Sequence, residues 1–129
     1  MGAVNRRLQT ARKALQTLEE LDLTPGDAIV RDAAIQRFEY TFEAVWKAAQ
    51  AVLRERFGVV LASPKPVIRA CRENALLTDS ETRLALAMVD HRNLTAHTYN
   101  EALAEEIFAA LPAYRDLLHT WLNRLEASE

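Results

Sequence analysis

The chain has 129 residues, half of them hydrophobic, which is enough for one domain with a buried core and too few for two. Three glycines and four prolines are few for a sheet protein, and a net charge of -2 excludes recognition of nucleic acid by a globally basic surface. A single cysteine excludes an internal disulfide framework, and no apolar run reaches membrane-spanning length. We therefore expect one cytoplasmic, all-α domain over residues 1–129 that does not enter a membrane.

The first predicted helix occupies the N-terminal segment. Apolar residues recur there at spacings of four and three, which place them on one helical face: Val4, Leu8, Ala11, Leu15 and Leu18. The residues "TPGD" at 24–27 interrupt this pattern. Thr24 as the cap and Pro25 in the first turn are then expected to begin the second helix.

The second helix is predicted to be long and to end near Gly58. Its apolar face comprises Ile35, Phe38, Phe42, Val45, Ala49 and Val52, flanked by Trp46 and Leu53. A narrow polar seam follows the same helix at spacings of four, three and four: Asp32, Gln36, Glu39 and Glu43. Within this seam, Glu39 lies at the edge of the apolar face.

Three further helix starts follow along the chain. Ser63 with Pro64 behind it begins a short helix, and "TDSE" at 78–81 has the spacing of a capping box. Asn100 is placed to cap the last helix. The apolar face of that helix comprises Leu103, Ile107, Leu111, Tyr114, Leu118, Trp121 and Leu125. Short connections between these segments predict an up-and-down antiparallel helical bundle of four main helices and a short one.

The stretch "RNLTAHTY" at 92–99 concentrates polar residues at the end of an otherwise apolar helix. Arg92 continues the apolar direction of Met88 and Val89, so its guanidinium is expected to point inward and to need an anion. We predict that Glu39 is its neighbour. The simpler interpretation is a structural ion pair, with Asp32 and Glu43 as solvated residues.

His97 comes five residues after Arg92, about 140° away on a regular helix. The two side chains share a site only if the helix ends or unwinds around Thr95 and Ala96, or if a second chain brings its own copy near. Asn93 precedes His97 by four residues and is placed to orient the imidazole ring. The simpler interpretation is a lone histidine at a helix C-terminus, where positive charge is favourable.

Other chemistry has little support in the sequence. The three histidines lack metal-ligand spacing, Cys71 has no identified base, and no glycine-rich phosphate loop is present. We expect neither a metal nor a cofactor.

Three stretches resemble one family: "RDAAIQRFEYTFEAVWK" at 31–47, "SPKPVIRACRENALL" at 63–77 and "RNLTAHTYNEALAEEIF" at 92–108. With the R-x4-H-x-Y pattern, they are similar to the HEPN superfamily, in its branch of nucleotidyltransferase substrate-binding proteins. The resemblance implies a homodimer paired with a small nucleotidyltransferase in a toxin–antitoxin system. It assigns the site to Arg92, Asn93, His97 and Tyr99, with Glu39 as the acidic residue of "QRFE".

The resemblance leaves three functions open. The first is a metal-independent endoribonuclease that cleaves RNA with Arg92 and His97. The second is a non-catalytic substrate-binding partner of the nucleotidyltransferase, with Tyr99 as the acceptor of AMP (AMPylation). These two are compatible in relatives, because adenylylation of that tyrosine silences the nuclease. The third is a helical bundle used only for assembly.

Overall fold

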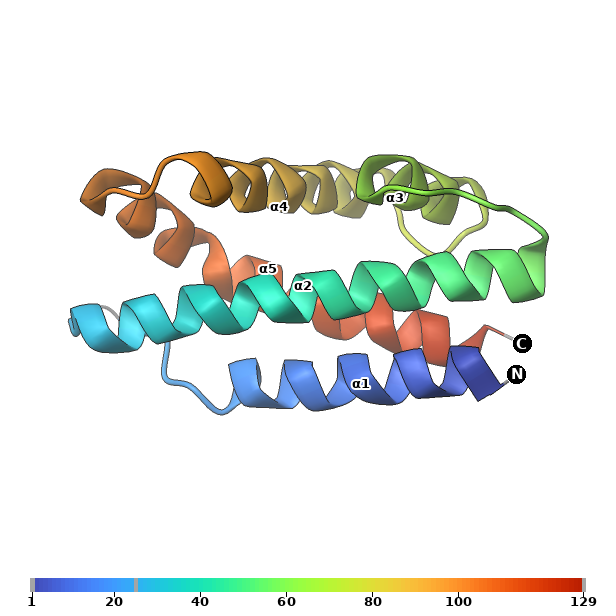
Figure 1. Ribbon diagram of the computed structural model, residues 1–129, viewed down its shortest axis with the longest axis horizontal. Coiled ribbons are helices and arrows are strands. Elements are labelled where there is room, and N and C mark those ends of the chain that lie inside the picture. Colours follow the sequence, from blue (N-terminus) through green and yellow to red (C-terminus); the bar gives the residue numbers. More distant parts are fainter. Residues whose placement is uncertain (1, 25, 129) are drawn as a thin grey trace.

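The computed structural model describes residues 2–24 and 26–128, and those residues form five helices and no strand. The helices are α1 (Gly2–Glu19), α2 (Ala28–Phe57), α3 (Pro64–Glu73), α4 (Asp79–His97) and α5 (Glu101–Ala127). Figure 1 shows α1, α2, α4 and α5 running alternately in opposite directions, with the short α3 beside α4 and both chain termini at one end. The prediction of an all-α bundle with four main helices and a short one is confirmed.

The core forms from the apolar faces that the spacing predicted. All five apolar residues of the α1 face are buried, as are the eight predicted on α2. On α5 the predicted face is buried from Ile107 to Leu125, while Leu103 is partly exposed. Phe38 stacks on Tyr114 with ring centroids 5.2 Å apart, which joins α2 to α5. Burial of one continuous face per helix therefore holds the bundle together.

The helix starts agree with the sequence at three of four places. Thr78 and Glu81 form the predicted capping box, and the Asn100 side chain accepts a 2.9 Å hydrogen bond from the Leu103 amide. Ser63 precedes α3 with proline at its start. The prediction for α2 is wrong: Asp27 caps it, accepting a 2.8 Å bond from the Ile29 amide, whereas Thr24 bonds to Asp22. Pro25 lies outside the described residues.

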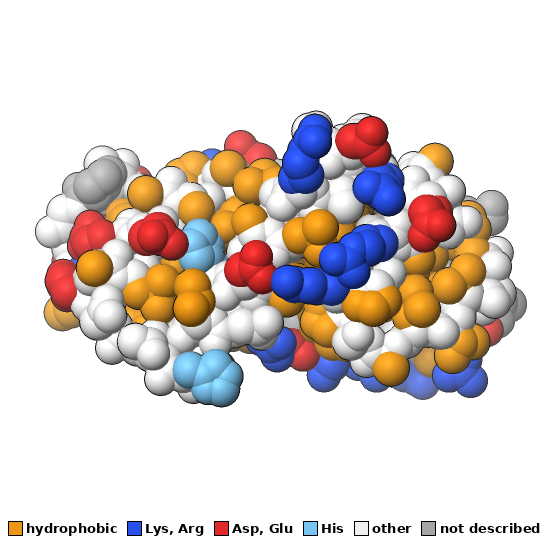
Figure 2. All heavy atoms as spheres, turned by 90° about the horizontal axis from the view of Figure 1, so that it is seen from above, with side chains coloured by type: hydrophobic (Ala, Val, Ile, Leu, Met, Phe, Trp, Pro, Cys, Tyr) orange, Lys and Arg blue, Asp and Glu red, His pale blue; other side chains and the backbone are white. Residues whose placement is uncertain are grey.

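Helix α4 changes character along its length. Its four buried residues, Thr82, Ala85, Met88 and Val89, all lie before residue 90, whereas residues 90–97 are half-buried or exposed. The backbone of α4 packs against α3 and α5. Figure 2 views the molecule from the side of α3 and α4 and shows basic side chains gathered over one half, with acidic side chains toward the opposite end and also among the basic ones. Among the described helices, none is long and apolar enough to span a bilayer.

Candidate functional site

Arg92 lies in the half-buried part of α4 and pairs with a carboxylate of α2. One Nη donates a 2.5 Å hydrogen bond to Glu43, and the two side chains are 34% and 29% exposed. Glu43 also faces Lys47 on the next turn of α2, at 3.7 Å. The predicted inward direction of Arg92 is thus only partly realised, because a third of the side chain remains open to water.

Glu39, the predicted neighbour of Arg92, forms no ion pair with it among the described residues. Glu39 instead accepts a hydrogen bond from the Thr95 hydroxyl, which also lies 2.8 Å from the Arg92 carbonyl oxygen. Glu39 and Glu43 are one helical turn apart on α2, about 6 Å along the axis. The offset between α2 and α4 therefore brings Glu43, the last carboxylate of the seam, to the guanidinium in place of Glu39. Glu43, which the simpler interpretation left solvated, is the partner.

His97 and Asn93 both point to solvent. Both are exposed, and within the described residues no hydrogen bond joins their side chains to each other or to a neighbour. The predicted orientation of the His97 ring by Asn93 is therefore absent from this chain. Because α4 stays helical through His97 and the Thr98 amide bonds to the Leu94 carbonyl at 2.8 Å, Arg92 and His97 remain on different faces.

Tyr99 follows the end of α4 and is half-exposed. Its hydroxyl donates a 3.1 Å hydrogen bond to the Asp32 carboxylate near the start of α2. Partial burial and then the bond to Asp32 raise the pKa of the Tyr99 phenol above its ordinary value. The side chain is thus both accessible and held by one defined contact.

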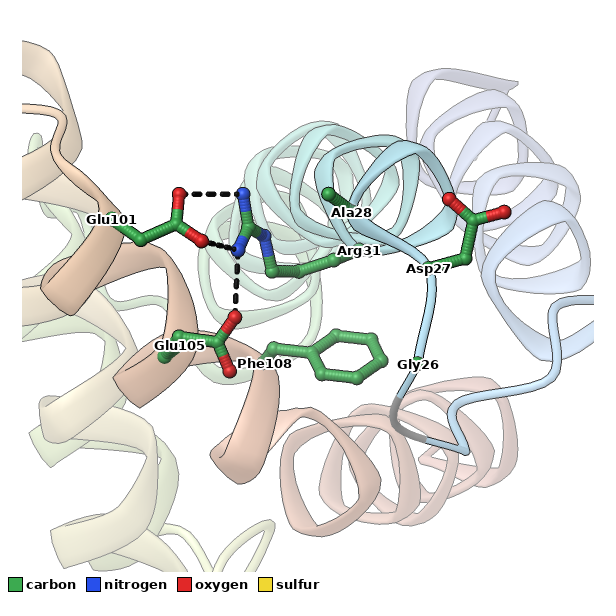
Figure 3. A pocket seen from close by; sticks show the side chains of 7 residues that line it. All are labelled: Gly26, Asp27, Ala28, Arg31, Glu101, Glu105 and Phe108. Atoms are coloured by element: carbon green, nitrogen blue, oxygen red, sulfur yellow. Dashed lines mark hydrogen bonds and ion pairs between the residues drawn. The ribbon is translucent and has the colours of Figure 1, made fainter.

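Arg31 is a residue that the sequence analysis missed. It is 7% exposed and makes four hydrogen bonds to carboxylates: Nη1 to Glu101 and to Glu105 at 2.6 Å, Nη2 to Glu101 at 3.3 Å, and Nε to Asp32 at 3.0 Å. Figure 3 shows the guanidinium between Glu101 and Glu105 in a pocket of about 340 Å³. The Glu101 bond, followed by the Glu105 and Asp32 bonds, raises the pKa of Arg31, and the same contact lowers that of Glu101.

A signal for Arg31 was present in the sequence. Arg31 precedes Ile35 by four residues and Phe38 by seven, so it continues the apolar face of α2 toward its start. The same reasoning singled out Arg92 on α4. The two partners of Arg31 on α5, Glu101 and Glu105, lie 70 and 74 residues away in the sequence, so local spacing could not identify them.

A second histidine of α4 belongs to the structure of the bundle. His91 Nδ1 lies 2.7 Å from the Tyr114 hydroxyl, and Nε2 lies 2.7 Å from Glu106. Burial raises the pKa of Tyr114 to about 12, with Glu106 and Asp90 adding to the shift. Since Tyr114 is 2% exposed and lies on α5, this network joins α4 to the core through α5.

The described residues contain no cluster of three or more metal-binding side chains. Cys71 is buried, and burial raises the pKa of its thiol to about 12, so it is a poor nucleophile. The chemistry available on the exposed end of α4 and just after it is therefore that of the Arg92 guanidinium, the His97 imidazole and the Tyr99 phenol.

The chain is similar to known proteins in sequence and in fold. Residues 6–127 match the family described as "Nucleotidyltransferase substrate binding protein like". A crystal structure of a protein from Thermus thermophilus is 61% identical, with 89% of this chain and 98% of that chain covered and a TM-score of 0.85. None of the curated proteins matches the sequence.

More distant structures share the fold. One is a tri-AMPylated Shewanella oneidensis HEPN toxin in complex with MNT antitoxin, at 17% identity over 96% of each chain with a TM-score of 0.76. Another is a mutant of the toxin–antitoxin MntA-HpeT, at 16% identity over 98% of this chain and 99% of that chain, with a TM-score of 0.77. At such low identity they establish the architecture alone.

Proposed function

This chain belongs to the nucleotidyltransferase substrate binding protein like family, and we propose that it is the HEPN toxin of a toxin–antitoxin pair. In this proposal it is a cytoplasmic, metal-independent endoribonuclease whose partner is a small nucleotidyltransferase. The observation that carries the proposal is the part of α4 that has no buried residue, residues 90–97, which we call the uncovered half of α4. There Arg92 has one carboxylate partner and His97 is open to solvent. Within this segment His91 is bonded to Tyr114 of the core, whereas the His97 side chain is exposed and so is available for chemistry.

Cleavage would proceed through the ribose itself. The 2′-hydroxyl attacks the adjoining phosphorus, the bond to the 5′-oxygen breaks, and a cyclic phosphate and a free 5′-hydroxyl form. His97 moves the proton, and Arg92 stabilises the charge that builds on the phosphate oxygens. Because about a third of the Arg92 side chain is exposed, a phosphate can approach it beside Glu43. Asn93 would orient the histidine only once RNA or a second chain is bound.

We propose that the working unit is a homodimer. Within one chain Arg92 and His97 lie on different faces of a regular helix, and one histidine cannot easily serve as both acid and base in a single step. A second copy of α4 packed against residues 90–97 would supply the missing groups. Leu94, an apolar side chain 48% exposed in this half of α4, suits such a contact.

The nuclease is tested by incubating the purified chain with RNA in EDTA. The wild type should cleave, and His97→Ala should lose cleavage by about 10²-fold or more. His119→Ala is the matched control, because His119 is also exposed but pairs with Glu19 on α1. Cleavage by His97→Ala at the wild-type rate would contradict the assignment.

The dimer is tested by mixing subunits. When His97→Ala is added to a fixed amount of wild type and allowed to exchange, the rate per wild-type chain should fall if each site needs both copies. A rate that stays constant, or a monomer in sedimentation at the assay concentration, would contradict the shared site.

Tyr99 is the proposed acceptor of AMP from the transferase, which would silence the nuclease by adding a bulky anion two residues after His97. After incubation with the proposed nucleotidyltransferase partner, ATP and Mg²⁺, mass spectrometry should find AMP on the wild type and none on Tyr99→Phe. Tyr40→Phe is the control, since Tyr40 is 42% exposed and bonds to Thr17. The alternative function, a non-catalytic substrate-binding partner, would show AMP transfer without RNA cleavage by the wild type.

A further inference from the structure

Asp32 receives two hydrogen bonds on the same carboxylate oxygen. Oδ1 accepts from Arg31 Nε at 3.0 Å and from the Tyr99 hydroxyl at 3.1 Å. The two donors come from places 68 residues apart in the sequence, near the start of α2 and just after α4. The tertiary fold therefore places a fixed carboxylate directly on the phenol proposed as the AMP acceptor.

The carboxylate is anchored on one side and open on the other. Arg31 is nearly buried and is held by Glu101 and Glu105, so its Nε offers a fixed donor to Asp32. The Asp32 side chain is 53% exposed and Tyr99 is 50% exposed. A transferase with bound nucleotide can therefore reach the phenol oxygen while Asp32 remains in contact with it.

Transfer of AMP to a tyrosine requires removal of its proton. The neutral phenol is a weak nucleophile, and the raised pKa of Tyr99 makes the phenolate scarcer still near pH 7. An aspartate performs this task in protein kinases, where it accepts the proton of the substrate hydroxyl. A carboxylate within hydrogen-bond distance satisfies the geometric requirement for a general base.

We propose that this chain carries the proton acceptor for its own modification: Asp32 takes the Tyr99 proton as the phenol oxygen attacks the α-phosphorus of ATP. The new bond joins Tyr99 Oη to that phosphorus, the bond to the β-phosphate bridging oxygen breaks, and pyrophosphate leaves with its electron pair. The transferase supplies the nucleotide and its metal ion. Arg31 is a positioning residue that acts through Asp32. The inference rests on the proposed role of Tyr99 as the acceptor.

The experiment measures AMP transfer to this chain by the nucleotidyltransferase partner of the proposed pair, with Mg²⁺ and ATP, across pH 6 to 9. Asp32→Asn keeps a hydrogen-bond acceptor of the same shape but cannot take a proton. We expect its kcat to fall by about 10²-fold while the KM for the acceptor chain changes little. Its rate should also rise more steeply with pH than that of the wild type, because only the phenolate then reacts. Asp32→Glu should recover part of the rate at pH 7.

Asp116→Asn is the matched control. Arg115 and Asp116 on α5 repeat the same local pair, with Arg115 Nε 3.3 Å from the Asp116 carboxylate, but no tyrosine in the described part of the chain bonds to it. This variant should transfer AMP at the wild-type rate. Circular dichroism of each variant verifies that the bundle is intact.

Each outcome either supports or overturns the role of Asp32. An unchanged kcat in Asp32→Asn, or a lower kcat with the pH profile of the wild type, would show that Asp32 is not the proton acceptor. If the wild type accepts no AMP on Tyr99, the acceptor role of Tyr99 and that of Asp32 are both overturned. Labelled wild type with an unaffected Asp32→Asn variant overturns the role of Asp32 alone.

Discussion

Arg31 and Arg92 are two arginines that pair with carboxylates across helices, and they differ in how far their hydrogen-bonding groups are satisfied. Arg31 is nearly buried and makes four hydrogen bonds to three carboxylates. Arg92 is a third exposed and, among the described residues, makes one side-chain hydrogen bond, to Glu43. A guanidinium has five N–H donors, so Arg92 retains four of them for a phosphate, whereas Arg31 retains one.

This difference favours Arg92 over Arg31 as the arginine that would bind a phosphate. The carboxylates around Arg31 outnumber its single charge, which disfavours a further anion in the adjoining pocket. The charge of Glu43 is shared between Arg92 and Lys47, which leaves that region closer to neutral. The uncovered half of α4 is therefore the place where RNA would be expected to bind.

The largest expected effect is on activity, in Arg92→Ala. Loss of a donor to the transition-state phosphate should lower RNA cleavage by about 10²- to 10³-fold. The unfolding free energy should change little, because exposed ion pairs contribute about 0–1 kcal/mol. Cleavage assays in EDTA and urea titrations measure the two quantities.

Arg124→Ala provides the control for Arg92→Ala. Arg124 is 36% exposed and pairs with Glu81, so this variant removes a similar ion pair elsewhere in the bundle. It should cleave RNA at the wild-type rate. Equal loss of cleavage in both variants would show that Arg92 acts only through stability.

In contrast to Arg92→Ala, Arg31→Ala should lower the stability of the protein. Without the guanidinium, Asp32, Glu101 and Glu105 lose their shared cation, so the thermal midpoint should fall by about 4–8 °C. Arg31→Lys should recover only part, since an ammonium cannot reproduce the bidentate contact with Glu101. Circular dichroism melting measures both, and a midpoint equal to that of the wild type would mean that the network contributes nothing.

Glu43→Gln should have a moderate effect on cleavage. Glu43 holds Arg92, so its loss should misplace the guanidinium and slow cleavage by about tenfold. Glu39→Gln is the matched variant one turn away, and it should change the rate less because Glu39 bonds to Thr95. Single-turnover rates distinguish them. A greater loss of cleavage in Glu39→Gln than in Glu43→Gln would indicate that Glu39, as the sequence suggested, is the carboxylate that holds Arg92.

The smallest expected effect concerns Glu81, whose pKa lies below its ordinary value because Arg124 donates hydrogen bonds to it. A lowered folded-state pKa stabilises the protein above the unfolded value, about 4.3, and this contribution is lost as the pH falls through the folded-state value. Glu81→Gln should therefore cost about 1 kcal/mol at pH 7 and less at pH 3. Urea midpoints at the two pH values measure this, and an equal difference at both would exclude the linkage.

The arrangement of the bundle was predictable because it follows from local patterns. The faces of α1 and α2 and the caps Thr78 and Asn100 depend on residues within one or two turns of each other. The start of α2 was misplaced because Thr24 and Asp27 both suit a cap, and the structure uses the later one. The candidate site was predicted as a region, through Arg92 and the residues after it, and its role stays a prediction.

The sequence by itself determined which way each side chain points around its helix axis, since 3.6 residues per turn convert spacing into direction. Only the tertiary structure decided which carboxylate meets which arginine, because that depends on how far one helix is shifted along another. A shift of one turn exchanges Glu39 for Glu43 at Arg92, and the approach of α5 to α2 brings Glu101 and Glu105 to Arg31. The tertiary structure also set Asp32 against Tyr99, a contact between residues 67 apart that helical spacing cannot encode.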